Sequence, residues 1–411
     1  MKQGDKIKTF IEDRSENVKV GLVGAGQMGQ GIVAQISKMY GVDIVCIIDR
    51  NQKQLEIASD RYKKYKNNQI LCSDSIASLD NVELDIVIVI EATGTPVAGA
   101  SVAKNVLNRG INLILLNVET EATIGLALRK EAEKNDAIVT VADGDEPVAA
   151  LDLYNFATEL SFEVISIGKG KNNPFNTFAT PSLLTKEASL KQMNPKMLTS
   201  FVDGTKTMVE MTALANFLDF NIDVDGMHGI EATYENINQY YIPKVDGGLL
   251  DESQVVDFAF GIAPGVFAVI YSEDDYVNYE MEYLKMGKGP YWTLARPYHL
   301  TSLEIPRTIR HIMLEKYSKL SAQSWNVEVV AYAKQDIEPG TNLGSIGGDY
   351  IYGKAQKISS SRGLLPIGIA EDNIANKAIA KGNPIAIGEV NAQDNELCEY
   401  WDYQNQILDS D

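Results

Sequence analysis

Residues 18–29 read VKVGLVGAGQMG, an apolar run that ends in three glycines at positions 24, 26 and 29. The apolar run is typical of a buried β-strand, and the helical pattern that follows, over residues 27–39, places the glycines at a strand-to-helix turn. In such a turn the first glycine permits a tight bend, the second lets a phosphate approach the backbone, and the third lets helix and strand pack closely. The stretch therefore predicts the first βαβ unit of a parallel sheet. The alternative is a glycine-rich turn that binds nothing.

Further apolar runs follow at regular intervals, and helical patterns separate them. We expect strands over residues 43–48, 85–91, 111–118 and 137–142. Strands that are apolar on both faces and alternate with helices are typical of a parallel sheet covered on both sides. The fold class predicted from this pattern is α/β, with an N-terminal Rossmann domain.

Beyond residue 162 the pattern changes, and the 411 residues exceed the size of one small domain. We expect one long helix over residues 196–220, a strand over 266–271 and a helix over 303–314. A small β-rich module begins at a strand over 327–333 and continues with strand-like residues 364–369. The expected domains are a dinucleotide-binding Rossmann domain (1–160), an α+β substrate-binding and oligomerisation domain (161–324), and a β-rich domain with an acidic, peripheral tail (325–411).

The composition narrows the class of partner. The formal net charge is -19, and an acidic surface repels nucleic acid phosphates and anionic membranes, so we expect neither as a partner. Residues 1–17 are polar and charged and do not resemble a secretion signal, and the apolar runs are too short to span a bilayer. A cytoplasmic protein is expected.

The glycine loop predicts a nicotinamide dinucleotide, NAD or NADP, as cofactor. The free amides of the helix start, at Gln27 and Met28, would face its pyrophosphate. At the end of the second strand, Asp49 can accept hydrogen bonds from the ribose hydroxyls of NAD, whereas Arg50 can hold the 2′-phosphate of NADP or simply be a solvated charge. Loops after two later strands add Thr93 and Asn117 to the expected cofactor site.

Loops at the carboxyl ends of parallel strands face the ligand crevice, and these loops carry carboxylates. Glu119 and Glu146 are candidate catalytic residues. Asp143 and Asp145 are candidate ligands for a divalent cation such as Mg²⁺ or Mn²⁺. The alternative for the acidic group at 143–146 is capping of a following helix.

A basic stretch, residues 168–174, combines lysines with asparagine amides in what we expect to be a flexible loop. Lys169, Lys171 and Asn172 would suit a phosphate or carboxylate of a substrate, and the alternative is a solvated basic loop. Lys285, Arg296 and His299 lie in a second candidate substrate region, although a lone histidine is more often structural.

The expected long helix carries Asp203, Lys206 and Glu210 at spacings of three and four, which would place them on one face. A surface ladder of ion pairs is one interpretation. In the other, Lys206 is desolvated beside the carboxylates and serves as proton donor or electrostatic stabiliser for a substrate oxygen, with Asp203 beside it.

These stretches together resemble a known family. The sequence is similar to the homoserine-dehydrogenase-like oxidoreductases with a C-terminal SAF domain, also called 1-deoxy-D-xylulose 5-phosphate reductoisomerase-like enzymes. The similarity covers nearly the whole chain, and its most specific part is MNPKMLTSFVDGTK over residues 193–206. Residues 117–119, 143–147, 168–174, 227–229 and 284–299 match as well. The SAF-like features are the turn at 336–340 and the segment 363–368.

The resemblance implies NADPH-dependent conversion of 1-deoxy-D-xylulose 5-phosphate into 2-C-methyl-D-erythritol 4-phosphate, or reaction of a related sugar or polyol phosphate, in a homo-oligomer. Divalent cations would assist by binding vicinal oxygens. Two other functions stay open. One is a dehydrogenase for a small hydroxy acid or semialdehyde, like homoserine dehydrogenase, and the other is a non-catalytic dinucleotide sensor.

Overall fold

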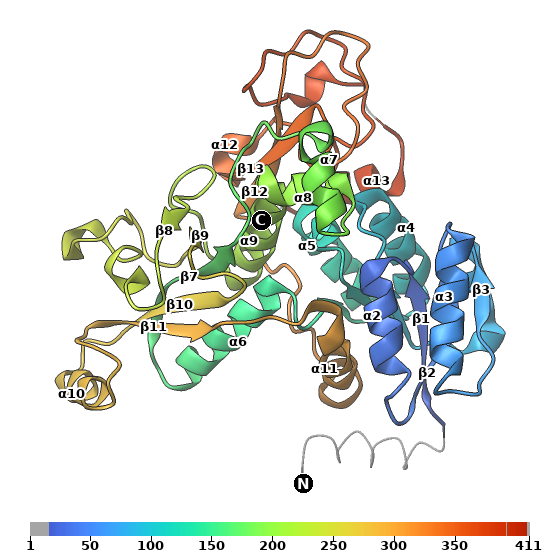
Figure 1. Cartoon of the computed structure of the whole chain (residues 1–411), viewed down its shortest axis with the longest axis horizontal. Helices are drawn as coiled ribbons and strands as arrows, with labels where there is room; N and C mark the ends of the chain where they lie inside the picture. Colours follow the sequence, from blue (N-terminus) through green and yellow to red (C-terminus); the bar gives the residue numbers. More distant parts are fainter. Residues whose placement is uncertain (1–15, 392, 409–411) are drawn as a thin grey trace. The chain divides into compact units, whose positions relative to one another are not determined.

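The computed structural model describes residues 16–391 and 393–408 (Figure 1). It confirms the α/β class. The chain forms two compact units, each discontinuous in sequence: Met1–Asp145, Leu300–Ser321 and Asn395–Asp411 make the first, and Glu146–His299 and Ala322–Asp394 make the second. These units do not coincide with the three contiguous domains expected from the sequence. Residues 1–15, which carry most of the argument against a secretion signal, lie outside the described residues.

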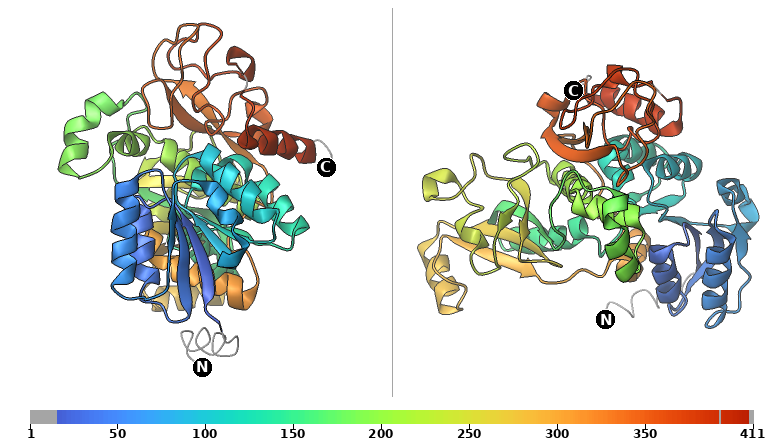
Figure 2. Two further views of the ribbon diagram at one scale, coloured as in Figure 1. Left: turned by 90° about the vertical axis from the view of Figure 1, so that its right-hand side faces the viewer. Right: turned by 45° about the horizontal axis from the view of Figure 1, so that its top comes forward.

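The first unit is built on a six-stranded parallel sheet with the order β3-β2-β1-β4-β5-β6. The left-hand view of Figure 2 shows its strands side by side. The strands are β1 (Val18–Val23), β2 (Val42–Ile48), β3 (Leu71–Ser73), β4 (Ile88–Glu91), β5 (Asn112–Leu115) and β6 (Val139–Val141). The helices between them are α2 (Gln27–Ile36), α3 (Gln52–Lys63), α4 (Pro96–Leu107) and α5 (Val118–Lys134). Five of these strands fall where the apolar runs predict them.

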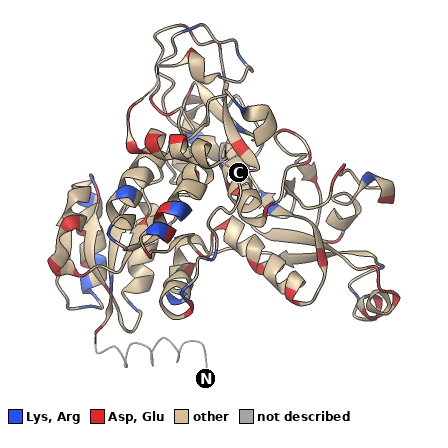
Figure 3. Cartoon of the chain, turned by 180° about the vertical axis from the view of Figure 1, so that it is seen from behind, with Lys and Arg blue, Asp and Glu red and all other residues tan. Residues whose placement is uncertain are grey.

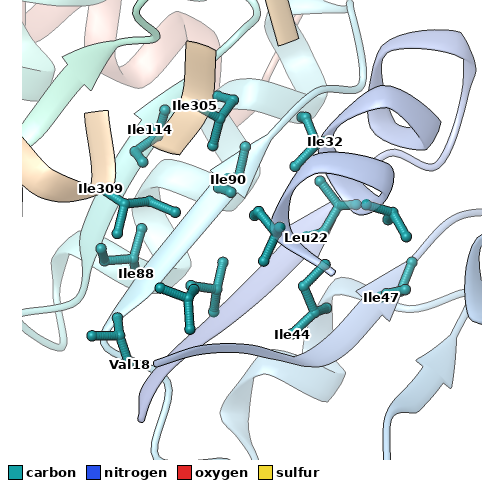
Figure 4. Packing of buried hydrophobic residues seen from close by; sticks show 14 of the residues in the cluster. Val18, Leu22, Ile32, Ile44, Ile47, Ile88, Ile90, Ile114, Ile305 and Ile309 are labelled. Carbon is teal, nitrogen blue, oxygen red and sulfur yellow. The ribbon is translucent and has the colours of Figure 1, made fainter. Parts of the chain in front are cut away.

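The core of this unit joins the sheet to a segment from late in the chain. Leu22 and Ile90 from the strands pack with Ile32 from α2, and with Ile305 and Ile309 from helix α11 (Ile305–Arg310), as Figure 4 shows. Burial of one such side chain stabilises a fold by about 1.5–3 kcal/mol. The predicted helix over 303–314 is confirmed in outline, because α11 continues into the π-helical turn His311–Glu315.

The acidic end of the chain is not peripheral, contrary to expectation. Residues Glu396–Leu408 form helix α13, which packs against α4 and α5 and buries Leu397, Tyr400 and Gln404. Its acidic side chains bond to α4, since Glu396 accepts from Ser101 at 3.1 Å and Glu399 from Lys104 at 2.5 Å. Apolar residues at helical spacing inside the acidic stretch explain the packing.

The second unit is built on a mixed five-stranded sheet with the order β11-β10-β7-β9-β8. Its strands are β7 (Glu163–Lys171), β8 (Ile230–Glu231), β9 (Val255–Phe260), β10 (Val266–Tyr271) and β11 (Tyr291–Arg296). Helices α6 (Glu146–Glu159) and α9 (Thr205–Leu218) pack on this sheet, and α10 (Asp275–Tyr283) lies between β10 and β11 in sequence. The central strand β7 contains most of the basic stretch expected to be a flexible loop, so that expectation is wrong.

The long helix expected over residues 196–220 is two helices. Helix α7 (Pro181–Leu190) precedes α8 (Pro195–Val202), and α9 starts at Thr205. The break falls at Asp203 and Gly204, where Gly204 has a left-handed φ of 90°. A Cβ at this glycine would collide with the ring of Phe175, so a side chain is excluded there on two grounds. Apolar spacing alone does not register such a break.

The module after residue 327 has the predicted strand β12 (Val327–Ala333), but its partner is β13 (Ile351–Lys357), which pairs with it antiparallel. The expected strand over 364–369 makes only isolated bridges, for example between Val330 and Pro366. Proline has no amide hydrogen to extend a ladder. The short helix α12 (Ile358–Ser361) follows β13.

The acidic residues of the chain are spread over many of its elements. Asp and Glu residues lie on helices and loops of both units, so the excess of 56 acidic over 37 basic residues is not confined to one element (Figure 3). Within residues 16–391 and 393–408, no helix combines the length and the hydropathy needed to cross a membrane.

Candidate cofactor site and candidate active site

The three glycines of the loop after β1 have distinct steric environments. Gly24 has a φ of 97°, and a Cβ there would lie 2.5 Å from the carbonyl oxygen of Ala92. A Cβ on Gly29 would collide with the carbonyl oxygen of Gly24, so helix α2 could not approach the strand. Around Gly26, in contrast, a Cβ would meet no atom of residues 16–391 or 393–408 within 4 Å. The chain therefore does not need a glycine at 26 for its own packing, which leaves the space to a ligand.

Helix α2 starts directly at this open glycine. Gly26 is its N-cap and makes no side-chain cap hydrogen bond, and Gln27 and Met28 form the first turn. Unsatisfied amides and the positive end of the helix dipole at this point suit a pyrophosphate.

Asp49, at the end of β2, is held next to the glycine loop. One carboxylate oxygen accepts from the Ala25 amide at 2.6 Å and the other from the Asn51 amide at 2.7 Å. Arg50 is exposed beside it. The structure thus brings both residues to the edge where a ribose would lie, and the choice between NAD and NADP stays a prediction.

The loops after β4 and β5 leave the sheet at the same level as the glycine loop. In the parallel register Val23 of β1 pairs with Glu91 of β4, and Glu91 pairs with Leu115 of β5. Thr93 and Asn117 each follow their paired residue by two positions, so they leave the sheet side by side. The Asn117 amide donates to the Thr95 carbonyl oxygen at 2.8 Å and ties the two loops together. All predicted cofactor residues therefore meet at one sheet edge.

Glu91 is a group at this edge to which the sequence reasoning gave no role. Its carboxyl is completely buried and accepts from the amide and the hydroxyl of Thr93. Burial raises its pKa to about 7. A glutamate that ends an otherwise apolar strand was the available signal. Glu119 lies nearby in the first turn of α5 and is also buried.

In the second unit, a buried lysine lies between two carboxylates. Lys169, on β7, contacts Glu146 Oε1 at 2.7 Å and also bonds to Glu210 of α9. Its side chain is 7% exposed. Burial alone would lower the pKa of Lys169, but the two carboxylates outweigh it and raise the pKa above its usual range. Burial and Glu146 raise the pKa of Glu210.

Lys171 lies two residues along β7, on the same face of the strand as Lys169. It is buried, donates to the carbonyl oxygen of Phe201, and lies over the Phe175 ring at 5.7 Å. Burial, together with the charge of Lys169, lowers its pKa to about 8. Within the described part of the chain its ammonium forms no ion pair. Because Lys169 and Lys171 are both buried on a strand, the interpretation of this stretch as a solvated loop is wrong.

Two residues of the second candidate region lie at the same end of the sheet. Val266 of β10 pairs with Lys169 on one side and Arg296 on the other. Arg296 contacts Asp152 at 3.3 Å, and His299 Nε2 lies 3.5 Å from Glu146 Oε1. The lysine, its two carboxylates and His299 thus form one polar cluster, which we call the Lys169 cluster.

Two predicted substrate residues lie elsewhere. Lys285 is exposed in the loop that leads into β11 at Tyr291, whereas Arg296 ends that strand. Tyr291 and Arg296 are the two ends of β11, and five steps of about 3.3 Å place them roughly 17 Å apart, so the loop with Lys285 enters at the end of the strand away from Arg296. Asn172 is exposed just beyond β7 and accepts from the neighbouring Asn173. Lys285 therefore does not join Arg296 and His299 as expected.

The expected triad on one helix face does not form. Asp203 ends α8 and makes a buried ion pair with Lys334 at 2.8 Å, and it also accepts from the Thr205 amide at 2.9 Å. Burial raises the pKa of Asp203. Lys206 and Glu210 share α9, and the charge of Lys206 acts on Glu210. Asp203 is thus engaged in holding the α8–α9 junction.

Asp143 does not fit the predicted metal site. Its buried carboxylate accepts from Thr308 at 3.0 Å and contacts Lys319 at 2.9 Å and Arg307 at 3.6 Å. Three groups that are positive or donate hydrogen bonds already surround the oxygens that a cation would need. Asp145 is buried too, and its amide bonds to the carbonyl oxygen of Ala142.

Models of two known protein families match the parts of the chain that contain these two sites. The model of the homoserine dehydrogenase NAD-binding domain matches residues 24–142, and that of the oxidoreductase DRL catalytic domain matches residues 144–305. The first match covers the glycine loop and the sheet edge, and the second covers the Lys169 cluster. The chain is an NAD(P)-dependent oxidoreductase. No curated protein is detectably similar to it in sequence.

Solved structures of several oxidoreductases are distantly similar. Biliverdin reductase from Synechocystis sp. PCC 6803 has 17% identity to this chain and a TM-score of 0.31. The match covers 39% of this chain and 48% of the biliverdin reductase, so this chain spans about half the length of that protein. Myo-inositol dehydrogenase from Corynebacterium glutamicum has 12% identity and a TM-score of 0.40, over 68% and 75%. A probable dehydrogenase from Thermotoga maritima has 12% and 0.42, over 73% and 90%. None of these similarities bears on the substrate.

Proposed function

We propose that this oxidoreductase uses NAD(P)H to reduce the carbonyl of a small phosphorylated substrate. The observation that carries the proposal is Lys169, a buried cation held between Glu146 and Glu210 at the carboxyl end of a central strand. Buried ionisable groups whose pKa values are shifted by specific partners concentrate at functional sites. Hydride transfer to a carbonyl leaves negative charge on its oxygen, and a preorganised cation is what stabilises that charge.

The residues of the Lys169 cluster divide the chemistry between them. Because its pKa lies above its usual range, Lys169 stays charged at neutral pH and acts as a hydrogen-bond donor to the developing oxyanion. Glu146 and His299 would carry the proton that neutralises it, since they lie 3.5 Å apart and Glu146 also contacts Lys169. Lys206, which acts on Glu210 from α9, remains our candidate for a second donor.

Lys171 supports an anionic substrate. A buried ammonium without an anionic partner is unfavourable, and a phosphate would supply the missing charge. Within this class we propose 1-deoxy-D-xylulose 5-phosphate as the first substrate to test, which would make the enzyme a reductoisomerase. A divalent cation is not part of the proposal, because Arg307, Lys319 and Thr308 already surround Asp143, and Lys169 lies between Glu146 and Glu210. A homo-oligomer and an SAF-type module after residue 325 belong to the same proposal.

A substrate panel tests the proposal. The protein is mixed with NADPH or NADH and with 1-deoxy-D-xylulose 5-phosphate, another ketose phosphate, or aspartate semialdehyde, and absorbance at the reduced nicotinamide band is followed. We expect oxidation with a phosphorylated substrate. Turnover with the unphosphorylated semialdehyde alone would favour the homoserine-dehydrogenase-like alternative. Dinucleotide binding without turnover on any substrate would favour the sensor.

A further inference from the structure

Helix α5, which starts at the cofactor edge of the sheet, is kinked. Ile124 has φ of -135° and ψ of 15°, which are not helical values. Just before it, the Thr123 hydroxyl donates to the carbonyl oxygen of Glu119 at 2.7 Å, a back-bond that tends to bend helices. The kink separates the first two turns of the helix from the rest.

A side chain from the other end of the sequence bridges this kink. Gln404, on α13, is 2% exposed. Its Oε1 accepts from the Ala127 amide at 3.3 Å, and its Nε2 donates to the Thr123 carbonyl oxygen at 3.1 Å. In an unbroken α-helix those two backbone groups would pair with each other. A side chain inserted into the ladder of helical hydrogen bonds is a recognised cause of a fixed kink.

The part of α5 ahead of the kink belongs to the cofactor site. Asn117 caps it by accepting from the Thr120 amide at 3.3 Å, and it also ties down the loop after β4. In the strand order, β5 lies on the side of the glycine loop opposite β2 and Asp49. A dinucleotide laid across this edge has its adenosine near β2, so its nicotinamide half lies towards β4 and β5.

We propose that Gln404 is a positioning residue for the nicotinamide half of the cofactor site. By holding the kink open with two hydrogen bonds, it fixes the direction of the first turns of α5 and hence the place of Asn117. The rest of α13 is anchored independently, through the bonds of Glu396 and Glu399 to α4 and through buried Leu397. Loss of the Gln404 hydrogen bonds therefore leaves the helix docked.

The decisive variant is Gln404→Met, which keeps the length of the side chain and removes both hydrogen bonds. Gln406→Met makes the same change at an exposed position of the same helix and serves as the control. Affinities for NADP⁺, NAD⁺ and ADP are measured by calorimetry, with circular dichroism as the check on folding. ADP is the probe for the adenosine and pyrophosphate half alone.

For Gln404→Met we expect the affinity for the preferred dinucleotide to fall about tenfold, the equivalent of one or two hydrogen bonds, while the ADP affinity stays within about twofold. The control should change neither. Unchanged dinucleotide affinity, or an equal loss for ADP, would overturn the proposal.

A second variant decides the matter if Gln404→Met does not fold. Gln404→Glu offers one acceptor and one donor when its carboxyl is protonated, and only acceptors when it is ionised. We expect its dinucleotide affinity to be near that of the native protein at pH 5.5 and to fall at pH 8, while its ADP affinity follows the native protein at both. An affinity ratio to native that does not change with pH would contradict the role of the donated hydrogen bond.

Discussion

Removal of the Lys169 ammonium should destabilise the second unit in a pH-dependent way. In Lys169→Met, buried Glu210 and partly exposed Glu146 keep their positions but lose the cation between them. Breaking a buried ion pair by removing one partner costs about 3–5 kcal/mol, because the remaining charge is uncompensated. We expect a loss of that size at pH 8.

The sign of the pH dependence follows from Glu210. Burial already raises its pKa above the ordinary value of 4.5, and loss of Lys169 raises it further. Above about pH 5 the folded variant therefore retains a proton that the unfolded chain has released. Native Glu210 also has a raised pKa, so the free energy of unfolding of the variant falls relative to native only over the pH range in which the variant still holds a proton that folded native has released. There it falls by up to about 1.4 kcal/mol per pH unit.

The assay is urea unfolding at pH 5 and pH 8, followed by far-ultraviolet circular dichroism. Lys191→Met is the control, since Lys191 forms an exposed pair with Glu187 at 2.7 Å on α7, and such surface pairs contribute about 0–1 kcal/mol. Adding Glu210→Gln to Lys169→Met should recover much of the loss at pH 8. A loss below about 1 kcal/mol, or one that is equal at both pH values, would refute the reasoning.

Three further predictions concern single side chains. Gly29→Ala should destabilise the first unit by about 1–3 kcal/mol, because the added Cβ collides with the Gly24 carbonyl oxygen. Gly26→Ala should keep the stability of the native protein and lose affinity for the dinucleotide. Equal unfolding midpoints for the two variants would contradict this reasoning. Native loses free energy of unfolding from pH 5 to pH 8, because the folded Glu91 carboxyl, with a pKa of about 7, holds its proton more tightly than the unfolded chain does. Glu91→Gln lacks this ionisation, so its free energy of unfolding should rise relative to native by up to about 3 kcal/mol over that range, as measured by denaturant titrations at both pH values. Lys171→Met should raise KM for a phosphorylated substrate about tenfold or more with a smaller change in kcat, and an unchanged KM in steady-state kinetics would exclude the anion-binding role.

Local sequence determined the cofactor half of this protein. A strand, a glycine turn and a helix follow one another within residues 18–36, and each is specified by its own residues: apolar alternation, positions without a Cβ, and helical spacing. Parallel strands that share an edge then bring Asp49, Thr93 and Asn117 together whatever the rest of the chain does. This is why the α/β class and the NAD(P) dependence could be predicted from the sequence alone.

The Lys169 cluster and the helix junctions depended on contacts between residues far apart in sequence. Residues 146, 169 and 210 belong to one helix, one strand and another helix, and nothing in their spacing predicts that a lysine in a glycine-rich stretch lies buried between two glutamates. The break before α9 moved Asp203 out of the expected triad, because a single left-handed glycine redirects a helix whose apolar spacing continues unchanged. Gln404 meets α5 across more than 270 residues. Burial and partner identity are properties of the folded chain, and they set the charges of the Lys169 cluster.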